Sequence, residues 1–275
     1  FKQSDYYAKA MLDPELNTKM VKEVSKYGRN ITKYIRYTSN GEPLVHPKSY
    51  EMINYAVDHS DTKVTLTTNG TLLNEKKMLR LLNSGLHMID ISIDAIKPET
   101  YAKVRVNGDL NKTQSNVLKL INLIQKSTYK TQLIVSFVEQ KLNVDESDEF
   151  RDYWINQGVK DVVIRKLHTN SGSLSSSFHP EIYKKNQKIE RRPCLYPWER
   201  VVITAKGHLN YCPTDWFGQA TICHYNETTI RDVWKSNFYN KLRNKHVCNK
   251  YNEKDLCKNC PDWSNTSWPF DKEKS

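Results

Sequence analysis

The sequence contains no long hydrophobic run, and this absence excludes a membrane-spanning helix. Its most apolar stretch, Val117–Ile124, is short and contains Lys119, whereas a spanning helix needs about 20 apolar residues. No signal-peptide pattern is visible either. We therefore expect a cytoplasmic protein with no membrane partner.

The sequence also lacks any run of more than two basic residues, although its net charge is +11 over 275 residues. Charge spread in this way favours a solvated basic surface over a nucleic-acid interface, and it remains compatible with an anionic small substrate. Hydrophobic residues make up 38% and aromatic residues 11% of the chain, which excludes a wholly disordered protein.

Three glycine motifs are missing, namely GxGxxG, the P-loop and GxSxG. The usual phosphate loops of nucleotide-binding folds are therefore absent, as is the nucleophile elbow of hydrolases. What is present is an alternation of strand and helix patterns. The predicted strands are 33–38, 63–67, 88–93, 132–138 and 161–165. This alternation predicts an α/β fold with a parallel sheet, best matched by a full or partial β/α barrel.

Cysteine is absent from the first two-thirds of the chain, and all six cysteines follow residue 193. The pattern changes there too, because a hairpin (200–212) and a helix (229–245) are predicted. We therefore predict a barrel domain over 1–168, a linker over 169–190 and a small α+β module over 191–275.

Four of the six cysteines have a spacing that suits one metal site. They are Cys194, Cys212, Cys257 and Cys260. A hairpin brings its two ends together, and the last pair forms a Cys-x-x-Cys loop, so the four thiolates are expected to converge. Such a set suits either zinc or a 4Fe–4S cluster. Cys223 and Cys248 have no near partner in the sequence and are interpreted as packing residues.

Polar residues follow the predicted strands at the edge where barrels place their chemistry. Glu42 follows Gly41 directly after the first strand, and Asn69 follows the second. Ser92 and Asp94 alternate at the third strand and are expected to share one face. A carboxylate beside a glycine can bind an ammonium group.

The last predicted strand ends with Arg165 and His168. We interpret these two residues as candidate substrate contacts, because they lie at the strand tip nearest the cysteine-containing module. A histidine at such a place more often has a structural role.

Several segments resemble the radical S-adenosylmethionine (SAM) enzymes. They are YIRYTSNGEPLVHP, TLTTNGTLL, DISIDAIKPETYAKVR and VVIRKLHTNSG. The later segments RRPCLYPWERVVITAKGHLNYCPTDWFG, TTIRDVWKS and CKNC resemble the SPASM or shorter twitch extension of that family. The resemblance covers nearly the whole chain and implies a partial (β/α)₆ barrel followed by an iron–sulfur module.

The resemblance also implies roles for individual residues. The family's GGEP loop matches Asn40, Gly41, Glu42 and Pro43, with asparagine in place of the first glycine, and this loop would hold the methionine ammonium of SAM. Ser92 and Asp94 fall where the family contacts the ribose or methionyl part, and Asn69 lies at the neighbouring strand end. The extension would bind one auxiliary 4Fe–4S cluster through the four cysteines named above.

The family's catalytic cluster is bound by a Cys-x-x-x-Cys-x-x-Cys loop, and this motif does not occur in the sequence. Because the sequence begins at Phe1 rather than Met, we expect the first barrel strand and that loop to lie upstream. A second 4Fe–4S cluster is then expected only in the full-length protein.

The resemblance implies a radical SAM oxidoreductase. It would use 5′-deoxyadenosyl radical chemistry to oxidise or epimerise a small polar substrate such as a sugar or an aminocyclitol. It would receive electrons from a donor such as flavodoxin or ferredoxin. Two alternatives are a peptide-modifying SPASM enzyme and a non-enzymatic Cys₄ zinc module that binds RNA.

Overall fold

The computed structural model describes residues 9–38, 41–174, 180–187 and 189–266. The chain divides into two compact units. The sheet unit is Asn17–Leu167, and the C-terminal unit consists of the described parts of Phe1–Leu16 and His168–Ser275. The predicted domains over 1–168 and 191–275, with a linker over 169–190, stay predictions.

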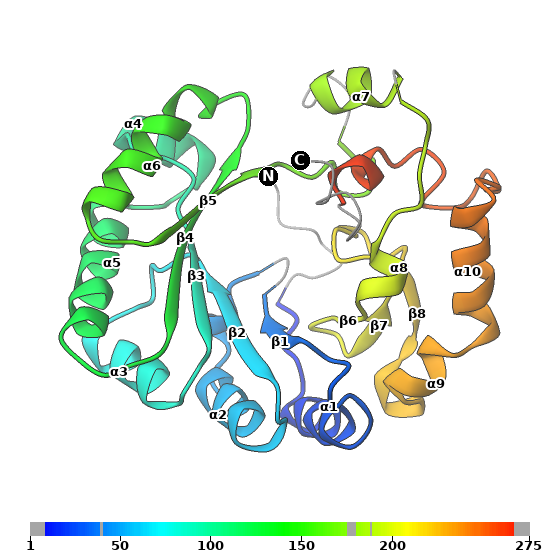
Figure 1. The fold of residues 1–275 in the computed structure, drawn as a ribbon, viewed down its shortest axis with the longest axis horizontal. Coiled ribbons are helices and arrows are strands. Elements are labelled where there is room, and N and C mark those ends of the chain that lie inside the picture. Colours follow the sequence, from blue (N-terminus) through cyan, green and yellow to red (C-terminus); the bar gives the residue numbers. More distant parts are fainter. Residues whose placement is uncertain (1–8, 39–40, 175–179, 188, 267–275) are drawn as a thin grey trace. The chain divides into compact units, whose positions relative to one another are not determined.

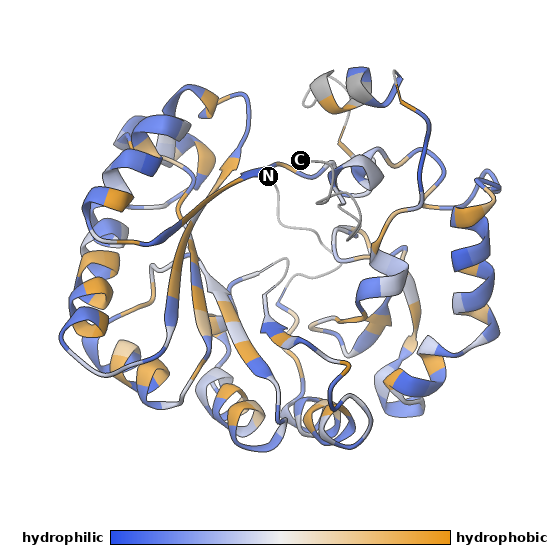
Figure 2. Ribbon diagram, viewed as in Figure 1, coloured by the Kyte–Doolittle hydropathy of each residue, from blue (hydrophilic) through white to orange (hydrophobic). Residues whose placement is uncertain are grey.

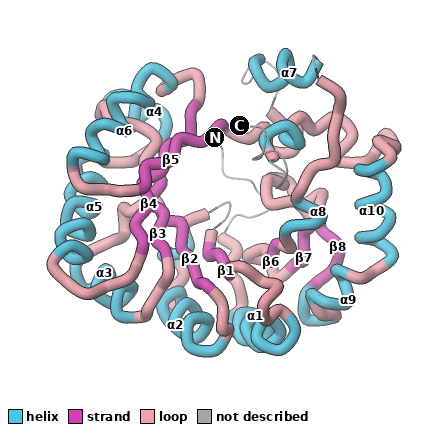
Figure 3. The backbone as a smooth tube through the Cα atoms, viewed as in Figure 1, coloured by secondary structure: helices cyan, strands magenta, loops and turns pink. Residues whose placement is uncertain are grey.

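The sheet unit contains a parallel sheet in which each strand neighbours the next one along the chain (Figure 3). Its described strands are β1 (Tyr34–Tyr37), β2 (Lys63–Thr68), β3 (Met88–Ser92), β4 (Gln132–Glu139) and β5 (Asp161–Lys166). This sequential order is that of a β/α barrel, because each crossover helix returns the chain to the adjacent position. The predicted α/β fold with a parallel sheet is confirmed.

Helices lie along one face of this sheet (Figure 1). They are α1 (Pro14–Tyr27), α2 (Ser49–His59), α3 (Glu75–Asn83), α4 (Pro98–Val104), α5 (Leu110–Gln125) and α6 (Ser147–Asn156). Side-chain caps fix two of their starts, since Asn74 accepts from the amide of Lys77 and Asp109 from that of Lys112. None of the described helices combines the length and the apolar composition needed to cross a membrane.

The two faces of the sheet differ in polarity, because side chains alternate along each strand. The helix-facing residues are apolar and fully buried; they include Leu66, Ile89, Ile91, Val135 and Phe137. Figure 2 shows hydrophobic residues along these strands and in stripes on the helices. The other face, called the inner face here, carries Asp90, Ser92 and Ser136 at the intervening positions. The core is thus between sheet and helices, and polar groups are left on the inner face.

The C-terminal unit contains a small antiparallel sheet in the order β6-β7-β8. The strands are β6 (Val202–Ile203), β7 (His208–Asn210) and β8 (Thr221–His224). Its helices are α7 (Pro180–Gln187), α8 (Tyr196–Glu199), α9 (Ile230–Trp234) and α10 (Asn237–Val247). The predicted hairpin is confirmed as β6-β7, with Gly207 at φ +76° in its turn.

Two expectations for this unit need correction. The single helix predicted over 229–245 is two helices, because the Ser236 side chain accepts from the amide of Tyr239 and starts α10 anew. The segment interpreted as a linker contains α7 and two buried residues, Thr169 and Ser171. Both donate to the carboxylate of Asp262, so this part of the segment is fixed in place.

Candidate functional site

Glu42 joins the ends of β1 and β2. One carboxylate oxygen accepts from the Thr68 hydroxyl at 2.8 Å and the Leu44 amide at 3.0 Å, and the other accepts from the Asn69 amide at 2.7 Å. Pro43 begins a short 3-10 turn directly after Glu42 and directs the chain away from the strand end. The structure therefore brings Glu42 and Asn69 together, as the strand-end pattern predicts.

The backbone at Gly41 is exposed and is not crowded by other described residues. A Cβ atom added to Gly41 would meet no atom within 4 Å among the described residues. Asn40, its neighbour in the predicted SAM loop, lies outside the described residues. The Asn69 side chain shapes its own loop, because its oxygen accepts from the amide and the hydroxyl of Thr71.

Ser92 and Asp94 meet at the end of β3. The strand ends at Ser92, and Asp94 follows in the left-handed conformation at φ +66°. Strand alternation therefore does not reach Asp94, but the Ser92 hydroxyl still donates to it at 3.3 Å. Arg105 binds both residues, with 2.7 Å to the Ser92 oxygen and an ion pair to Asp94. Arg105 is not among the predicted site residues, although it is the last residue of the segment DISIDAIKPETYAKVR.

The sheet unit contains a second polar cluster, centred on Asp90 of β3. Its carboxylate is fully buried and accepts from the guanidinium groups of Arg36 on β1 and Arg165 on β5. Arg165, a predicted substrate contact, is thus on the inner face of the sheet. His168, the other predicted contact, is half-buried and belongs to the C-terminal unit.

The four predicted cysteine ligands lie close enough together to affect one another's ionisation. Burial raises the pKa of Cys194 to about 12, and the charge of Cys212 adds to this effect. Burial likewise raises the pKa of Cys257 to about 12, with contributions from Cys212 and Cys194. The pKa of Cys260 is raised by burial, with smaller contributions from Asp262, Cys212 and Cys257.

The other two cysteines are separate from this group. Burial raises the pKa of Cys223, with a contribution from Glu227 and none from the four thiols. Cys248 is exposed and caps the end of α10, so its interpretation as a packing residue is wrong. None of the six forms a disulfide.

Buried thiols with raised pKa values need a positively charged partner in order to ionise, and a bound metal centre supplies one. Two further contacts support the group. The Ser171 hydroxyl lies 3.1 Å from the sulfur of Cys212, and Arg191 donates to the carbonyls of Cys257 and Lys258. Four cysteine thiols are by their chemistry the donor set of a 4Fe–4S cluster.

The spacing of the thiols can be compared with that of zinc ligands. No three His, Cys, Asp or Glu side chains in the described parts of the chain are close enough to hold one metal ion. As they lie in the described parts of the chain, the four thiols therefore do not form a site for a single zinc ion.

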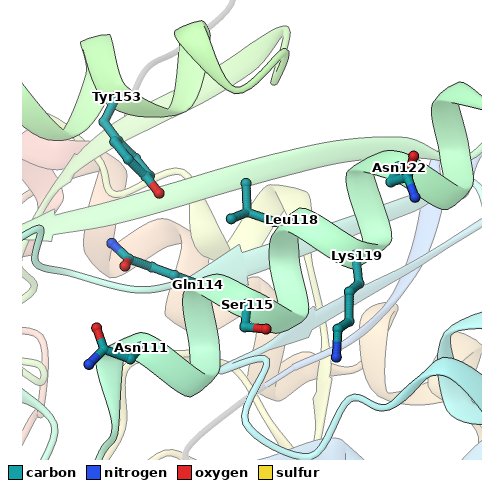
Figure 4. Close-up of a pocket in the computed structure, with 7 residues that line it drawn as sticks. All are labelled: Asn111, Gln114, Ser115, Leu118, Lys119, Asn122 and Tyr153. Atoms are coloured by element: carbon teal, nitrogen blue, oxygen red, sulfur yellow. The ribbon is translucent and has the colours of Figure 1, made fainter.

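A surface pocket of about 430 Å³ lies elsewhere, on helices α5 and α6 (Figure 4). Its lining residues are Asn111, Gln114, Ser115, Leu118, Lys119, Asn122 and Tyr153. These side chains are on the helical layer, whereas Asp90 and its partners are on the inner face. None of the predicted site residues lines it.

Two family models match the chain. The radical SAM superfamily model matches residues 4–146, and the SPASM model, described as an iron–sulfur cluster-binding domain, matches residues 194–261.

Curated relatives match at moderate identity. A probable GTP 3′,8-cyclase of Methanococcus maripaludis is 30% identical over 55% of this chain and 47% of its own length. The chain thus spans about half the length of this relative. An AdoMet-dependent heme synthase of Methanosarcina barkeri is 24% identical over 90% of this chain and 82% of its own length.

Solved structures share the fold. The crystal structure of BtrN in complex with AdoMet and 2-DOIA has a TM-score of 0.58 and 17% identity, over 90% of this chain and 80% of that one. Streptococcus suis SuiB bound to precursor peptide SuiA has a TM-score of 0.64 and 14% identity, over 90% of this chain and 64% of that one.

Proposed function

The chain belongs to the radical SAM superfamily, and on that premise we propose that it binds SAM at the strand ends of its sheet unit and an auxiliary iron–sulfur cluster in its C-terminal unit. Two matches support this assignment, one over residues 4–146 and one over residues 194–261. They also confirm the resemblance inferred from the strand-end loops and from the cysteine spacing.

Glu42 is the residue we assign to the methionine ammonium of SAM. Its carboxylate is held at the edge of the sheet by three donors from two loops, so it is oriented before any ligand arrives. The backbone at Gly41 is not crowded by other described residues. The loops after β1 and β2, with Asn40 and Asn69, would then surround the methionyl group.

Ser92 and Asp94 are assigned to the ribose or the remaining methionyl part of SAM. Both bind Arg105, which fixes their rotamers and balances the charge of Asp94. A polar pair held in this way can exchange hydrogen bonds with hydroxyl groups at little entropic cost.

Cys194, Cys212, Cys257 and Cys260 would hold the auxiliary cluster. Arg191 donates to two carbonyls of the Cys257–Cys260 loop and thereby fixes the loop that presents two of these thiols. A catalytic 4Fe–4S cluster with SAM would supply 5′-deoxyadenosyl radical chemistry, and the auxiliary cluster would bind substrate or accept an electron.

For the substrate, we propose a small polar molecule such as a sugar or an aminocyclitol, contacted by Arg165 and His168. BtrN, which shares the fold, was solved with AdoMet and 2-DOIA. SuiB, with the same fold, was solved with a precursor peptide, so a peptide substrate is the second candidate. A flavodoxin or ferredoxin in the cytoplasm would supply electrons in either case.

The observation that supports the proposal most strongly is the Glu42 carboxylate held between two strand-end loops of a radical SAM chain. The test is anaerobic formation of 5′-deoxyadenosine from SAM by the protein expressed from its own start codon. Glu42→Gln should weaken SAM binding about tenfold or more, because a charge-assisted hydrogen bond is lost.

Glu51→Gln is the matched control, since Glu51 is an exposed glutamate on helix α2 that pairs with Arg80. Equal SAM binding by the wild type and the Glu42→Gln variant would overturn the assignment of Glu42. Absence of 5′-deoxyadenosine from a protein with its clusters reconstituted would overturn the enzymatic function.

A further inference from the structure

A buried histidine lies beside the first predicted cluster ligand of the C-terminal unit. His246, in the last turn of α10, is 3% exposed. Its Nδ1 atom accepts from the backbone amide of Cys194 at 3.4 Å and lies 3.0 Å from the hydroxyl oxygen of Tyr251. We call these three residues the His246 group.

The amide of Cys194 determines which nitrogen of this ring carries the proton. A backbone amide can only donate, so Nδ1 is an acceptor and carries no proton. The Tyr251 hydroxyl then also donates to Nδ1, and the proton of the neutral ring is on Nε2. The two donors share one lone pair, and the bond from Cys194 is accordingly long. Nε2 is buried and has no hydrogen-bond partner among the described residues.

The end of α10 returns the chain toward the last turn of the helix. Asn249 has φ +51°, and the amide of Lys250 donates to the carbonyl of Lys245 at 3.0 Å. This pattern is a Schellman turn, with asparagine in the left-handed position that follows the helix cap. Tyr251 comes directly after this turn, which explains how its hydroxyl reaches His246.

Arg191 connects the His246 group to the second ligand segment. Its guanidinium carbon lies 4.4 Å from the centroid of the Tyr251 ring, and its nitrogens donate to the carbonyls of Cys257 and Lys258. Arg191 also precedes Cys194 by only three residues. Protein contacts therefore link the backbone at Cys194 to the backbone at Cys257, although the two are far apart in the sequence.

Packing alone does not account for a histidine at this place. The ring of His246 contacts the rings of Trp198 and Tyr251, with centroids 6.1 Å and 5.4 Å away. A hydrocarbon ring could pack there without leaving a buried nitrogen that lacks a partner, which costs free energy. What histidine adds is the acceptor that holds the amide of Cys194.

We propose that His246 is a positioning residue for the auxiliary cluster, which with Tyr251 and Arg191 sets the backbone at Cys194 relative to that at Cys257. This inference rests on the proposed function, because it takes both cysteines as cluster ligands. Groups that orient metal ligands in this way change metal affinity by about 10–100-fold when they are removed. His246 should therefore slow the release of the cluster.

The experiment uses the chain of residues 1–275, reconstituted anaerobically with iron and sulfide. All six cysteines follow residue 193, so a cysteine-bound cluster can form only in the C-terminal unit. His246→Phe keeps an aromatic ring and removes the acceptor, so release of iron to a chelator should become about tenfold faster or more. His246→Asn should restore most of the wild-type rate, because the asparagine oxygen can accept at the place of Nδ1.

Electron paramagnetic resonance of the reduced cluster separates positioning from a general loss of stability. The shape of the spectrum depends on how the ligands surround the iron atoms, whereas a less stable fold only lowers the number of clusters. His246→Phe should change the shape of the spectrum, and His246→Asn should restore it. A wild-type spectrum at lower intensity would overturn the proposal, and so would an unchanged rate of iron release.

His59→Phe is the matched control. His59 is also a histidine in the last turn of a helix, α2, and stacks on Tyr55 with ring centroids 4.2 Å apart. It belongs to the sheet unit, which has no cysteine, so its substitution should change neither the rate nor the spectrum. If His246→Phe does not fold, Tyr251→Leu provides the test, because it removes the second donor and the ring beside Arg191. It should also speed iron release and alter the spectrum.

Cys194→Ala separates this inference from the proposed function. If this variant keeps its iron and sulfide, or if the wild type binds no cluster, the ligand assignment of the proposed function is wrong and the inference falls with it. If Cys194→Ala loses the cluster while His246→Phe matches the wild type in rate and spectrum, the inference alone is wrong.

Discussion

The two units hold their candidate sites by different means. In the sheet unit, Glu42, Ser92 and Asp90 are attached to strand ends or strands whose other face is packed against helices, and each has protein partners for its polar atoms. In the C-terminal unit, the sheet is short, with only Val202–Ile203 in β6, and the four predicted ligands are half-buried cysteines.

This difference indicates where the stability of each site comes from. Burial of apolar side chains such as Leu66 and Phe137 stabilises the sheet unit whether or not a ligand is bound. Binding of the proposed cluster would be coupled to folding in the C-terminal unit, because the thiols must ionise in order to bind it. The comparison can be tested with substitutions that destabilise one unit at a time.

The largest effect is expected from Cys257→Ala. Loss of this ligand should abolish the auxiliary cluster and unfold much of the C-terminal unit, an effect on the order of 10 kcal/mol by analogy with structural metal sites. Hydrogen exchange should increase across residues 194–261 and remain unchanged in β2, β3 and β4. Cys248→Ala is the control, because this exposed cysteine lies outside the thiol group. Equal iron and sulfide content in both variants would refute the ligand assignment.

Phe137→Ala should produce the opposite pattern. Phe137 is fully buried and packs on Phe150 with ring centroids 4.9 Å apart, so its truncation should cost about 3–5 kcal/mol. Denaturation followed by circular dichroism should show the sheet unit unfolding earlier, while iron content stays at the wild-type level. Val106→Ala serves as the control, because Val106 is exposed. A loss of iron from the Phe137 variant would mean that the two units do not respond independently.

An intermediate effect is expected from Asp262→Asn. The carboxylate is buried and accepts from the amides of Thr169 and Ser171 and from the Thr169 hydroxyl. The side-chain nitrogen of asparagine is a hydrogen-bond donor and cannot accept from the donors that face this carboxylate. At least one of these hydrogen bonds is therefore lost, which should destabilise the fold by about 1–3 kcal/mol. Ser171 also contacts Cys212, so the variant should take up iron more slowly during reconstitution while keeping the same final content. A thermal midpoint equal to that of the wild type would show that Asp262 does not hold this segment.

Local pattern was sufficient to predict part of the molecule. Strand and helix alternation predicted the parallel sheet, and it placed Glu42 and Asn69 at adjoining strand ends, where they do contact each other. The hairpin turn at Gly207 is also predictable from local pattern, because glycine readily adopts the positive φ that this turn requires.

Contacts that depend on the curvature of the sheet were not predictable. The bonds from Arg36 and Arg165 to Asp90 span 54 and 75 residues, and nothing in the local pattern of any one strand indicates them. Arg105 reaches Ser92 from beyond a helix, and strand β8 is too short to give a pattern of its own. The apolar periodicity continues across Ser236 and so predicts a single helix there. The helix break follows from the capping side chain of Ser236, which periodicity alone does not indicate.

The smallest effect is expected on the helical surface of the sheet unit, where neither a core nor a ligand is involved. The Arg80 side chain hydrogen-bonds to Glu51 and lowers the pKa of that carboxyl below its usual value of 4.5. A lowered pKa means that the pair stabilises the folded state above pH 4.5 and that this contribution is lost as the pH falls through the lower folded-state value. Because both side chains are about half exposed, the contribution should be below about 1 kcal/mol. Arg80→Gln should therefore lower the free energy of unfolding slightly at pH 7 and by less as the pH falls below 4.5, as measured by urea denaturation. An equal difference above and below pH 4.5 would show that Arg80 acts through its packing on Tyr50 rather than through its charge.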